Sequence, residues 1–291
     1  MIDYNKPMLV FQTDFTYKEG AVSSMYGVVK SVDRTLEIID GTHELPQYDT
    51  WSASYRLYQS LRFWPEGTIY VSVVDPGVGT SRRACVAKVK GEEGGFYYVV
   101  TPDNGALTHL KAYMGIVEVR RIDESINRLR GKGTEGVSIF HGRDLFGYTA
   151  ARLASGIISY EGVGPAYPVD EIVMHPLPEP AFSDGYASGM LEIDDPNFGN
   201  AWTNIPTLEA CRKSGFSYGD LLLATIFFER NKVYEAELPL VHSFGDVEKG
   251  KTLLYNNELM RIGFALSQGN FCQQYKVAFG GEWTVTLQKT E

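Results

Sequence analysis

The chain has 291 residues and a formal net charge of −9 at pH 7. This length exceeds the ~100–150 residues typical of one domain and favours two domains. The acidic balance argues against nucleic acid or an anionic membrane as a partner, because both are bound through basic surfaces. The longest apolar run, residues 221–228, is far shorter than the ~20 residues of a membrane span, and the N-terminus has no apolar signal segment. With three cysteines and no CxxC spacing, we expect a soluble cytoplasmic protein.

Strand-like and helix-like segments alternate through the first half of the chain. The strands are short and mostly apolar, and one helix carries Trp51, Tyr55 and Tyr58 on a single stripe. The predicted strands are residues 8–13, 36–40, 68–75, 84–89 and 96–101, and the predicted helices are 21–32, 49–64 and 143–156. Such alternation predicts an α/β domain with a largely parallel central sheet.

A cluster of five prolines between residues 165 and 180 marks a change in pattern. Proline interrupts helices and strands alike, so we predict a linker at 171–182. The linker separates an N-terminal domain, 1–170, from a C-terminal domain, 183–291. The second domain contains short strand-like segments, which predict a smaller β-rich domain, a sandwich or a barrel.

Three strands of the first domain end in a turn that contains an aspartate: Asp14, Asp75 and Asp103. In open α/β sheets, ligands bind outside the carboxyl ends of the strands, which makes these carboxylates candidates for a site. The alternative is turn chemistry, because aspartate often hydrogen-bonds the backbone of its own turn. The segment VVDPGVGTSRR lacks the spacing of a phosphate loop. We expect Asp75 to pair with Arg82, and Arg83 to point elsewhere.

The segment FHGRD places His141 just before a predicted helix. A lone histidine is often structural, but Asp75, Arg82 and His141 together could hold and polarise one water molecule. Histidine and aspartate also bind zinc, yet the chain has no HxH or HExxH spacing, so we predict no metal.

The segment DDPNFGNAWTN, residues 194–204, combines acids, a glycine turn, an amide and two aromatic rings. Asparagine amides match the edge of adenine, and aromatic rings stack on bases. A hairpin with a core tryptophan would give the same pattern, so both interpretations stay open at this point.

Taken in order, these motifs resemble those of the S-adenosyl-L-methionine hydroxide adenosyltransferases, relatives of fluorinating and chlorinating enzymes. The resemblance runs from about residue 8 to 285 and includes TDF, VVDPGVGTSRR, PDNG, FHGRD and FGNAWTNI. It implies an α/β domain, a barrel-like β domain and a homotrimer whose sites lie between the N-domain of one subunit and the C-domain of the next. It also implies hydrolysis of S-adenosyl-L-methionine to adenosine and L-methionine, with no separate cofactor.

The resemblance assigns roles by position. Asp75, Arg82 and His141 match the family's water-handling residues, Asp14 matches the acid that holds the ribose hydroxyls, and Tyr48 matches the ring beside the ribose. The remaining substrate-binding positions that it implies are Glu19 and Asp195 near the methionine end, Phe198, Asn200, Trp202 and Phe244 around the adenine, and Asn257, Ser267 and Gln268 in the late segment.

Three departures from the related enzymes affect these expectations. The late segment NNELMRIGFALSQGN departs from the family's usual small-residue pattern at the adenine and methionine end. The segment DDPNFGN is longer than the family's commoner form, so Asp194 could replace Asp195. Halide-using relatives carry an aromatic hydroxyl where Asp75 stands and a threonine where Val78 stands. A carboxylate repels halide but accepts a proton from water, which favours hydrolysis. The alternatives are adenosyl transfer to a halide and a non-catalytic protein that binds the nucleoside or S-adenosyl-L-methionine.

Overall fold

The computed structural model describes residues 1–131, 133–134 and 136–290. Lys132 and Glu135, in the predicted N-terminal domain, and Glu291, at the end of the predicted C-terminal domain, lie outside the described residues. The chain divides into two compact units, Met1–His175 and Pro176–Glu291, so the division falls within the predicted linker at 171–182.

The N-terminal unit contains a seven-stranded sheet in the order β2-β1-β3-β5-β4-β6-β7. Its strands are β1 Leu9–Thr13, β2 Ile38–Thr42, β3 Ile69–Val73, β4 Ala84–Lys90, β5 Phe96–Pro102, β6 Ile116–Arg121 and β7 Ala166–Tyr167. The first four strands in this order are parallel, whereas β4, β6 and β7 are antiparallel to their neighbours. The antiparallel pairing of β4 and β5 follows from the short loop at 91–95, because a parallel pair needs a long crossover.

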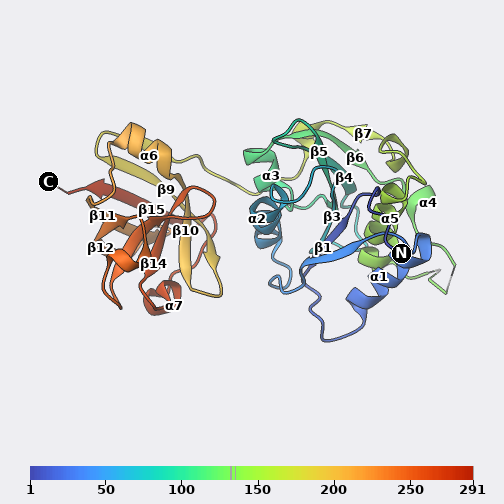
Figure 1. Cartoon of the computed structure of the whole chain (residues 1–291), viewed down its shortest axis with the longest axis horizontal. Coiled ribbons are helices and arrows are strands. Elements are labelled where there is room, and N and C mark those ends of the chain that lie inside the picture. The colour runs from blue at the N-terminus through green and yellow to red at the C-terminus, as the bar shows by residue number, and fades with distance from the viewer. Residues whose placement is uncertain (132, 135, 291) are drawn as a thin grey trace. The chain divides into compact units, whose positions relative to one another are not determined.

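Helices cover both faces of this sheet (Figure 1). They are α1 Ala21–Val32, α2 Thr50–Leu61, α3 Thr108–Tyr113, α4 Glu124–Asn127 and α5 Tyr148–Ala154, with short 3₁₀ turns at Glu161–Val163 and Val169–Glu171. The helices α1 and α5 pack together on one face, and α2 packs with α3 on the other. Every residue of β1 and β3 is therefore buried, as expected for strands covered on both faces. The predicted α/β fold is confirmed.

A π-helical turn, Gly142–Gly147, precedes α5, so the helix begins earlier than the predicted residue 143 and ends at Ala154. The carbonyl of Asp144 accepts the backbone N–H of Leu129 at 2.8 Å. An outside donor on a helix carbonyl is a common cause of such a widened turn, and these turns are frequent at functional sites.

The C-terminal unit is a closed seven-stranded β-barrel, which resolves the choice between sandwich and barrel. Its strands are β9 Tyr186–Asp195, β10 Asn200–Pro206, β11 Leu221–Phe228, β12 Asn231–Val241, β13 Thr252–Asn256, β14 Arg261–Leu266 and β15 Trp283–Lys289. Pairing of β10 with both β14 and β9 closes the barrel. Outside it lie β8 Ala181–Ser183, α6 Thr207–Ser214, α7 Phe271–Tyr275 and a 3₁₀ turn at Phe244–Asp246.

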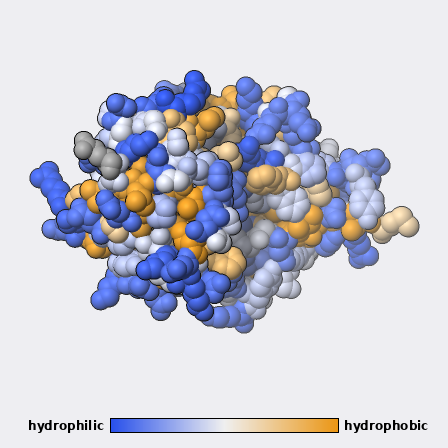
Figure 2. All heavy atoms as spheres, turned by 60° about the vertical axis from the view of Figure 1, so that its left-hand side comes forward, coloured by the Kyte–Doolittle hydropathy of each residue, from blue (hydrophilic) through white to orange (hydrophobic). Residues whose placement is uncertain are grey.

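The surface carries both hydrophilic and apolar side chains. Figure 2 shows one face, on which apolar patches are separated by hydrophilic residues. Three aromatic residues at predicted binding positions are exposed: Tyr48 at 69%, Phe198 at 65% and Phe244 at 42%. Among the residues that the structure describes, no helix is long and apolar enough to cross a membrane.

Candidate functional site

Two cavities, one in each unit, contain most of the predicted site residues. The N-terminal cavity has a volume of about 400 Å³ and is lined by Asp14, Phe15, Glu19, Gln47, Tyr48, Val73, Asp75, Val78 and Ile139–Gly142. The C-terminal cavity has a volume of about 650 Å³ and is lined by Asp195, Asn197, Phe198, Asn200, Trp202, Phe244, Tyr255, Asn257, Glu258, Leu266 and Gln268–Asn270. The predicted residues therefore form two separate groups.

Asp75 lies just beyond the carboxyl end of β3, at the start of a tight turn. The backbone N–H of Val78 donates to the Asp75 carbonyl at 3.2 Å, and Gly79 has a φ of 77°, which glycine adopts without a steric penalty. A side-chain carbon at Gly77 would lie 3.2 Å from Cγ of Arg82, so the glycine leaves room for that arginine to fold back.

Arg82 and Asp75 form a buried, bidentate ion pair. Nε of Arg82 donates to Oδ1 of Asp75 at 2.9 Å, and Nη2 donates to Oδ2. Only 5% of the Asp75 side chain and 10% of the Arg82 side chain are exposed. Arg82 also lies over the ring of Phe146, with Cζ 5.2 Å from the ring centre. The guanidinium is thus fixed behind the carboxylate, while Asp75 itself lines the cavity.

His141 completes this group from the start of the helix that contains the π turn. Its Nδ1 lies 2.8 Å from Nη2 of Arg82, the same nitrogen that contacts Asp75. Burial lowers the pKa of His141, and the guanidinium groups of Arg82 and Arg128 lower it further. The structure thus brings Asp75, Arg82 and His141 together, and favours the neutral form of the imidazole.

Arg83 points away from this group, as expected. Its Nε donates to Oδ2 of Asp103 at 3.0 Å and its Nη1 to Glu171 at 2.8 Å. Asp103 also accepts the backbone N–H of Val173 and the hydroxyl of Tyr167, at 2.9 and 3.0 Å. Of the three strand-end aspartates, Asp103 therefore holds the end of the N-terminal unit in place and does not line the cavity.

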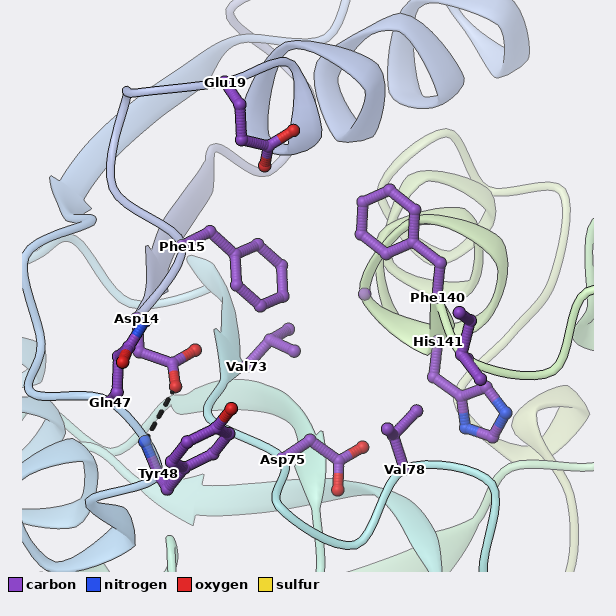
Figure 3. Close-up of a pocket in the computed structure, with 12 residues that line it drawn as sticks. Asp14, Phe15, Glu19, Gln47, Tyr48, Val73, Asp75, Val78, Phe140 and His141 are labelled. Atoms are coloured by element: carbon purple, nitrogen blue, oxygen red, sulfur yellow. Dashed lines mark hydrogen bonds between the residues drawn. The ribbon is translucent and has the colours of Figure 1, made fainter.

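Asp14 and Tyr48 lie on one side of the N-terminal cavity (Figure 3). Oδ2 of Asp14 accepts the backbone N–H of Tyr48 at 2.9 Å, and Tyr48 has a φ of 64°. Burial raises the pKa of Asp14, the N–H of Tyr48 opposes that rise, and the charge of Asp75 adds to it. Glu19 lines the same cavity from the loop before α1, on the opposite side of Phe15 from Asp75 in Figure 3.

Phe15 and Phe140 also line this cavity, although no role was predicted for them. Their rings contact each other edge to face, with centres 6.0 Å apart. Both belong to motifs already noted, TDF and FHGRD, in which a function was predicted only for the neighbouring Asp14 and His141. An aromatic residue next to a predicted site residue was the signal that could have identified them.

The loop between β9 and β10 builds one side of the C-terminal cavity. Oδ2 of Asp195 lies 3.3 Å from Nδ2 of Asn200, and the backbone N–H of Phe198 donates to Oδ1. Asp195 lines the cavity, whereas Asp194 is not among its described lining residues. Gly199 has a φ of 73°, and a side chain there would overlap Asn270, so the close approach of these two segments requires glycine.

Trp202 is positioned by a residue that no motif marked. Its Nε1 donates to the hydroxyl of Tyr255 at 2.7 Å, and the Tyr255 ring lies 4.8 Å from that of Phe244. All three residues line the C-terminal cavity. Tyr255 thus links two of the three predicted adenine-binding rings, and its position on β13 could not be related to them without the barrel register.

The late segment contributes unequally to the C-terminal cavity. Asn257 and Gln268 line it, whereas Ser267 is buried and is not among the described lining residues. Oδ1 of Asn257 accepts the backbone N–H groups of Leu259 and Arg261 at 2.9 and 3.0 Å, which stabilises the turn before β14. Asn257 therefore shapes its own turn as well as the cavity.

The two cavities share one electrostatic feature. Their described lining residues include the carboxylates of Asp14, Glu19, Asp75, Asp195 and Glu258, and no lysine or arginine. Such surroundings favour a ligand with positive charge. Across residues 1–131, 133–134 and 136–290, no group of three or more His, Cys, Asp or Glu side chains is arranged to hold a metal ion.

Comparison with known proteins gives consistent matches over both units. The model of the SAM hydroxide adenosyltransferase N-terminal domain matches residues 9–164, and that of the C-terminal domain matches residues 190–284. A relative from Salinispora tropica named (R)-S-adenosyl-L-methionine hydrolase is 32% identical, over 96% of this chain and 98% of its own. A fluorinase from Actinoplanes sp. is 27% identical, over 96% of this chain and 97% of its own. The crystal structure of an uncharacterized conserved protein from Thermotoga maritima has a TM-score of 0.84 and 30% identity, and the match covers 97% of this chain and 100% of that one.

Proposed function

Because the chain belongs to the S-adenosyl-L-methionine hydroxide adenosyltransferase family, we propose that it hydrolyses S-adenosyl-L-methionine to adenosine and L-methionine. The observation that carries the proposal is the contact of Arg82 with both Asp75 and His141 beside a cavity. The sulfonium of the substrate is a cation, which suits cavities lined by carboxylates without lysine or arginine among their described lining residues.

The proposed reaction is a single in-line displacement. The oxygen of water forms a bond to C5′ of the adenosyl group while the C5′–S bond breaks, and the electron pair of that bond remains on sulfur. Methionine leaves as a neutral thioether, so the reaction needs no general acid. Its main requirement is an oriented, desolvated nucleophile. The proton that water loses passes to Asp75, the carboxylate that lines the N-terminal cavity.

Arg82 gives Asp75 a fixed orientation in this scheme. Two parallel contacts hold the carboxylate more rigidly than one would. Asp14 accepts the ribose hydroxyls, and Tyr48 packs beside the ribose. Asp14 and Asp75 line the same cavity, which supports a ligand that contacts both.

The C-terminal cavity recognises the rest of the substrate in this proposal. The amide of Asn200 pairs with the adenine edge, between the rings of Phe198, Trp202 and Phe244. Asp195 accepts the methionine ammonium, and Glu19 lies near the same end of the substrate. We assign Asn257, Ser267 and Gln268 to the adenine and methionine end of the substrate; the cavity position of Asn257 and Gln268 supports this for two of the three.

We further propose that the protein is a homotrimer in which the N-terminal unit of one subunit and the C-terminal unit of the next share each substrate. The exposure of Tyr48, Phe198 and Phe244 supports this arrangement, because assembly around a ligand would cover these rings. Light scattering should give three times the chain mass of 32.5 kDa. A monomer that is fully active when dilute would contradict the shared site.

The second candidate is adenosyl transfer to a halide, since relatives include proteins named fluorinase. The carboxylate of Asp75 disfavours it, because like charges repel within a buried site. Chromatography of the purified protein with S-adenosyl-L-methionine and a halide separates the possibilities. Adenosine supports hydrolysis, a 5′-halo-adenosine supports transfer to the halide, and unchanged substrate indicates a binding protein.

A further inference from the structure

His141 has a second arginine beside it, which no sequence motif marks. Nη1 of Arg128 lies 3.5 Å from Nε2 of His141, while Nη2 of Arg82 lies 2.8 Å from Nδ1. Arg128 follows α4, and the two arginines thus approach the imidazole from its two nitrogens. Only 5% of His141 is exposed, so both contacts are largely shielded from solvent.

The chemistry of these groups restricts the protonation of His141. A guanidinium remains charged and can only donate hydrogen bonds. A protonated imidazole also donates from both nitrogens, so it would place N–H groups against both arginines. A neutral imidazole accepts at one nitrogen, and the shorter contact, to Arg82, identifies that nitrogen as Nδ1. The remaining proton is then on Nε2.

We propose that Arg128 acts as a positioning residue which, together with Arg82, holds His141 as a neutral imidazole protonated on Nε2. The lone pair of Nδ1 then accepts the hydrogen bond from Arg82. Nε2 carries the proton and therefore has no lone pair that could accept another. His141 orients Arg82 and cannot accept the proton of water, which leaves Asp75 as the proton acceptor. The assignment of Asp75 as proton acceptor rests on the hydrolysis proposed above, whereas the protonation state of His141 does not.

The anchoring of Arg128 supports this role. Its Nη1 donates to Oε2 of Glu124 at 2.6 Å, and its Nη2 donates to the carbonyl of Val137 at 3.0 Å. Nη1 of Arg128 therefore makes its shorter hydrogen bond to Glu124, at 2.6 Å against 3.5 Å to His141. Its interaction with His141 is mainly electrostatic. The guanidinium is fixed at that distance by groups outside the cavity lining.

The charges around His141 act in both directions. Burial and the two arginines lower the pKa of His141, whereas the carboxylates of Glu124 and Asp75 raise it. Asp144, on the same helical segment, is paired with Arg143 at 2.7 Å. A base with a lowered pKa stays neutral until the pH falls below that pKa. Removing Arg128 should therefore protonate His141 at a higher pH and disrupt its contact with Arg82.

Nuclear magnetic resonance of ¹⁵N-histidine-labelled protein tests the proposal directly. The chain has five histidines, and a His141→Gln variant assigns the signal of His141. We expect the wild-type spectrum at pH 7 to show the tautomer protonated on Nε2. In Arg128→Gln, the titration of His141 should move up by about one pH unit or more. Arg128→Lys keeps the charge and should titrate close to wild type.

Activity gives an independent readout. The ratio of kcat at pH 6 to kcat at pH 8 should fall in Arg128→Gln and recover in Arg128→Lys. Arg230→Gln, at an exposed site in the other unit, is the matched control and should keep the wild-type profile. A wild-type His141 that is protonated at pH 7, or that carries its proton on Nδ1, overturns the proposal even if Arg128→Gln fails to fold. An unmoved titration in a folded Arg128→Gln also overturns it. If the spectra are as expected but the protein forms no adenosine, the proposed function is contradicted and the proposed state of His141 is not.

Discussion

A buried ion pair lies beside the N-terminal cavity, whereas two of the aromatic rings that line the C-terminal cavity are exposed. Asp75 and Arg82 are buried in bidentate contact, and Nδ1 of His141 contacts the same arginine. Phe198 and Phe244 are exposed at the surface of the barrel unit. A reacting group needs its geometry before the substrate arrives, because reorganisation during the reaction raises the barrier. A recognition surface can become ordered when the ligand binds.

This difference predicts two kinds of mutational effect. Substitutions at Asp75, which lines the N-terminal cavity, and at Arg82, which orients it, should mainly lower kcat, because Asp75 acts on the reacting water in the proposed scheme. Substitutions in the C-terminal cavity should mainly raise KM with little change in kcat, which is the signature of lost uniform binding.

The largest effect is expected for Asp75→Asn. The amide keeps the shape of the side chain but accepts no proton from water at neutral pH. We expect turnover to fall by roughly 10²-fold or more, the usual scale for the loss of an acid–base group. Substrate affinity should remain, because it depends on Asp14, Asn200 and the aromatic rings. Steady-state adenosine release and calorimetric binding measure the two quantities. Hydrolysis at the wild-type rate would rule out Asp75 as the proton acceptor.

Much of the N-terminal cavity could be predicted because strand ends are local in sequence. The positions of Asp14 and Asp75 follow from the rule that parallel strands present their carboxyl ends at one edge of a sheet. The roles of Arg82 and Arg83 separate because successive residues in extended chain point in opposite directions. The antiparallel half of the sheet was harder to foresee, since buried strands of either direction have similar composition.

Residues whose partners are distant in sequence could not be predicted. Arg128 contacts His141 across a loop without any motif, and Tyr255 meets Trp202 only through the barrel register. Asp103 looked like a site residue because it ends a strand, but its carboxylate binds Arg83 and the backbone of Val173. Neither the site interpretation nor the turn interpretation describes Asp103, because its partners belong to segments outside its own turn. The sharing of a substrate between subunits stays a prediction.

The second-largest effect is expected for Asp14→Asn. This substitution tests whether a substrate-binding carboxylate lowers the stability of the folded protein. The raised pKa of Asp14 means that the folded state favours its protonated form. Stability from this group is therefore greatest at low pH and falls as the pH rises through the folded pKa. The substitution should leave the thermal midpoint at pH 8 unchanged or higher.

Substrate affinity in Asp14→Asn should fall by roughly tenfold or more, since hydrogen bonds to a charged acceptor are lost. For the same reason, wild-type affinity should weaken as the pH falls through the pKa of Asp14. Thermal melts and calorimetry over pH 4–8 check both statements. A strongly lowered midpoint at pH 8 would show that Asp14 is mainly structural.

Arg83→Ala separates stability from turnover within the N-terminal unit. The change removes a partner of the buried Asp103 and the contact with Glu171, so the free energy of unfolding should fall by about 1–3 kcal/mol. Turnover should change much less than in Arg82→Ala, whose guanidinium contacts Asp75 and His141. Chemical denaturation and steady-state kinetics on both variants give the comparison. Equal losses of turnover would mean that the two arginines are not functionally distinct.

The smallest expected effect is that of Tyr255→Phe in the C-terminal cavity. The hydroxyl of Tyr255 accepts the indole N–H of Trp202 at 2.7 Å, and burial raises the pKa of this hydroxyl, so it stays protonated. Phenylalanine keeps the ring against Phe244 and removes only this acceptor. One such hydrogen bond contributes about 0.5–1.5 kcal/mol, which corresponds to a rise in KM of roughly two- to tenfold.

The effect of Tyr255→Phe on kcat should be negligible, because Trp202 contacts the adenine and not the reacting atoms in the proposed complex. Tyr218→Phe is the matched control, since Tyr218 belongs to the same unit and does not line the cavity. Its KM should equal that of the wild type. A loss of kcat in Tyr255→Phe at unchanged KM would mean that the barrel unit also positions the reacting centre, and the contrast between the two cavities would then not hold.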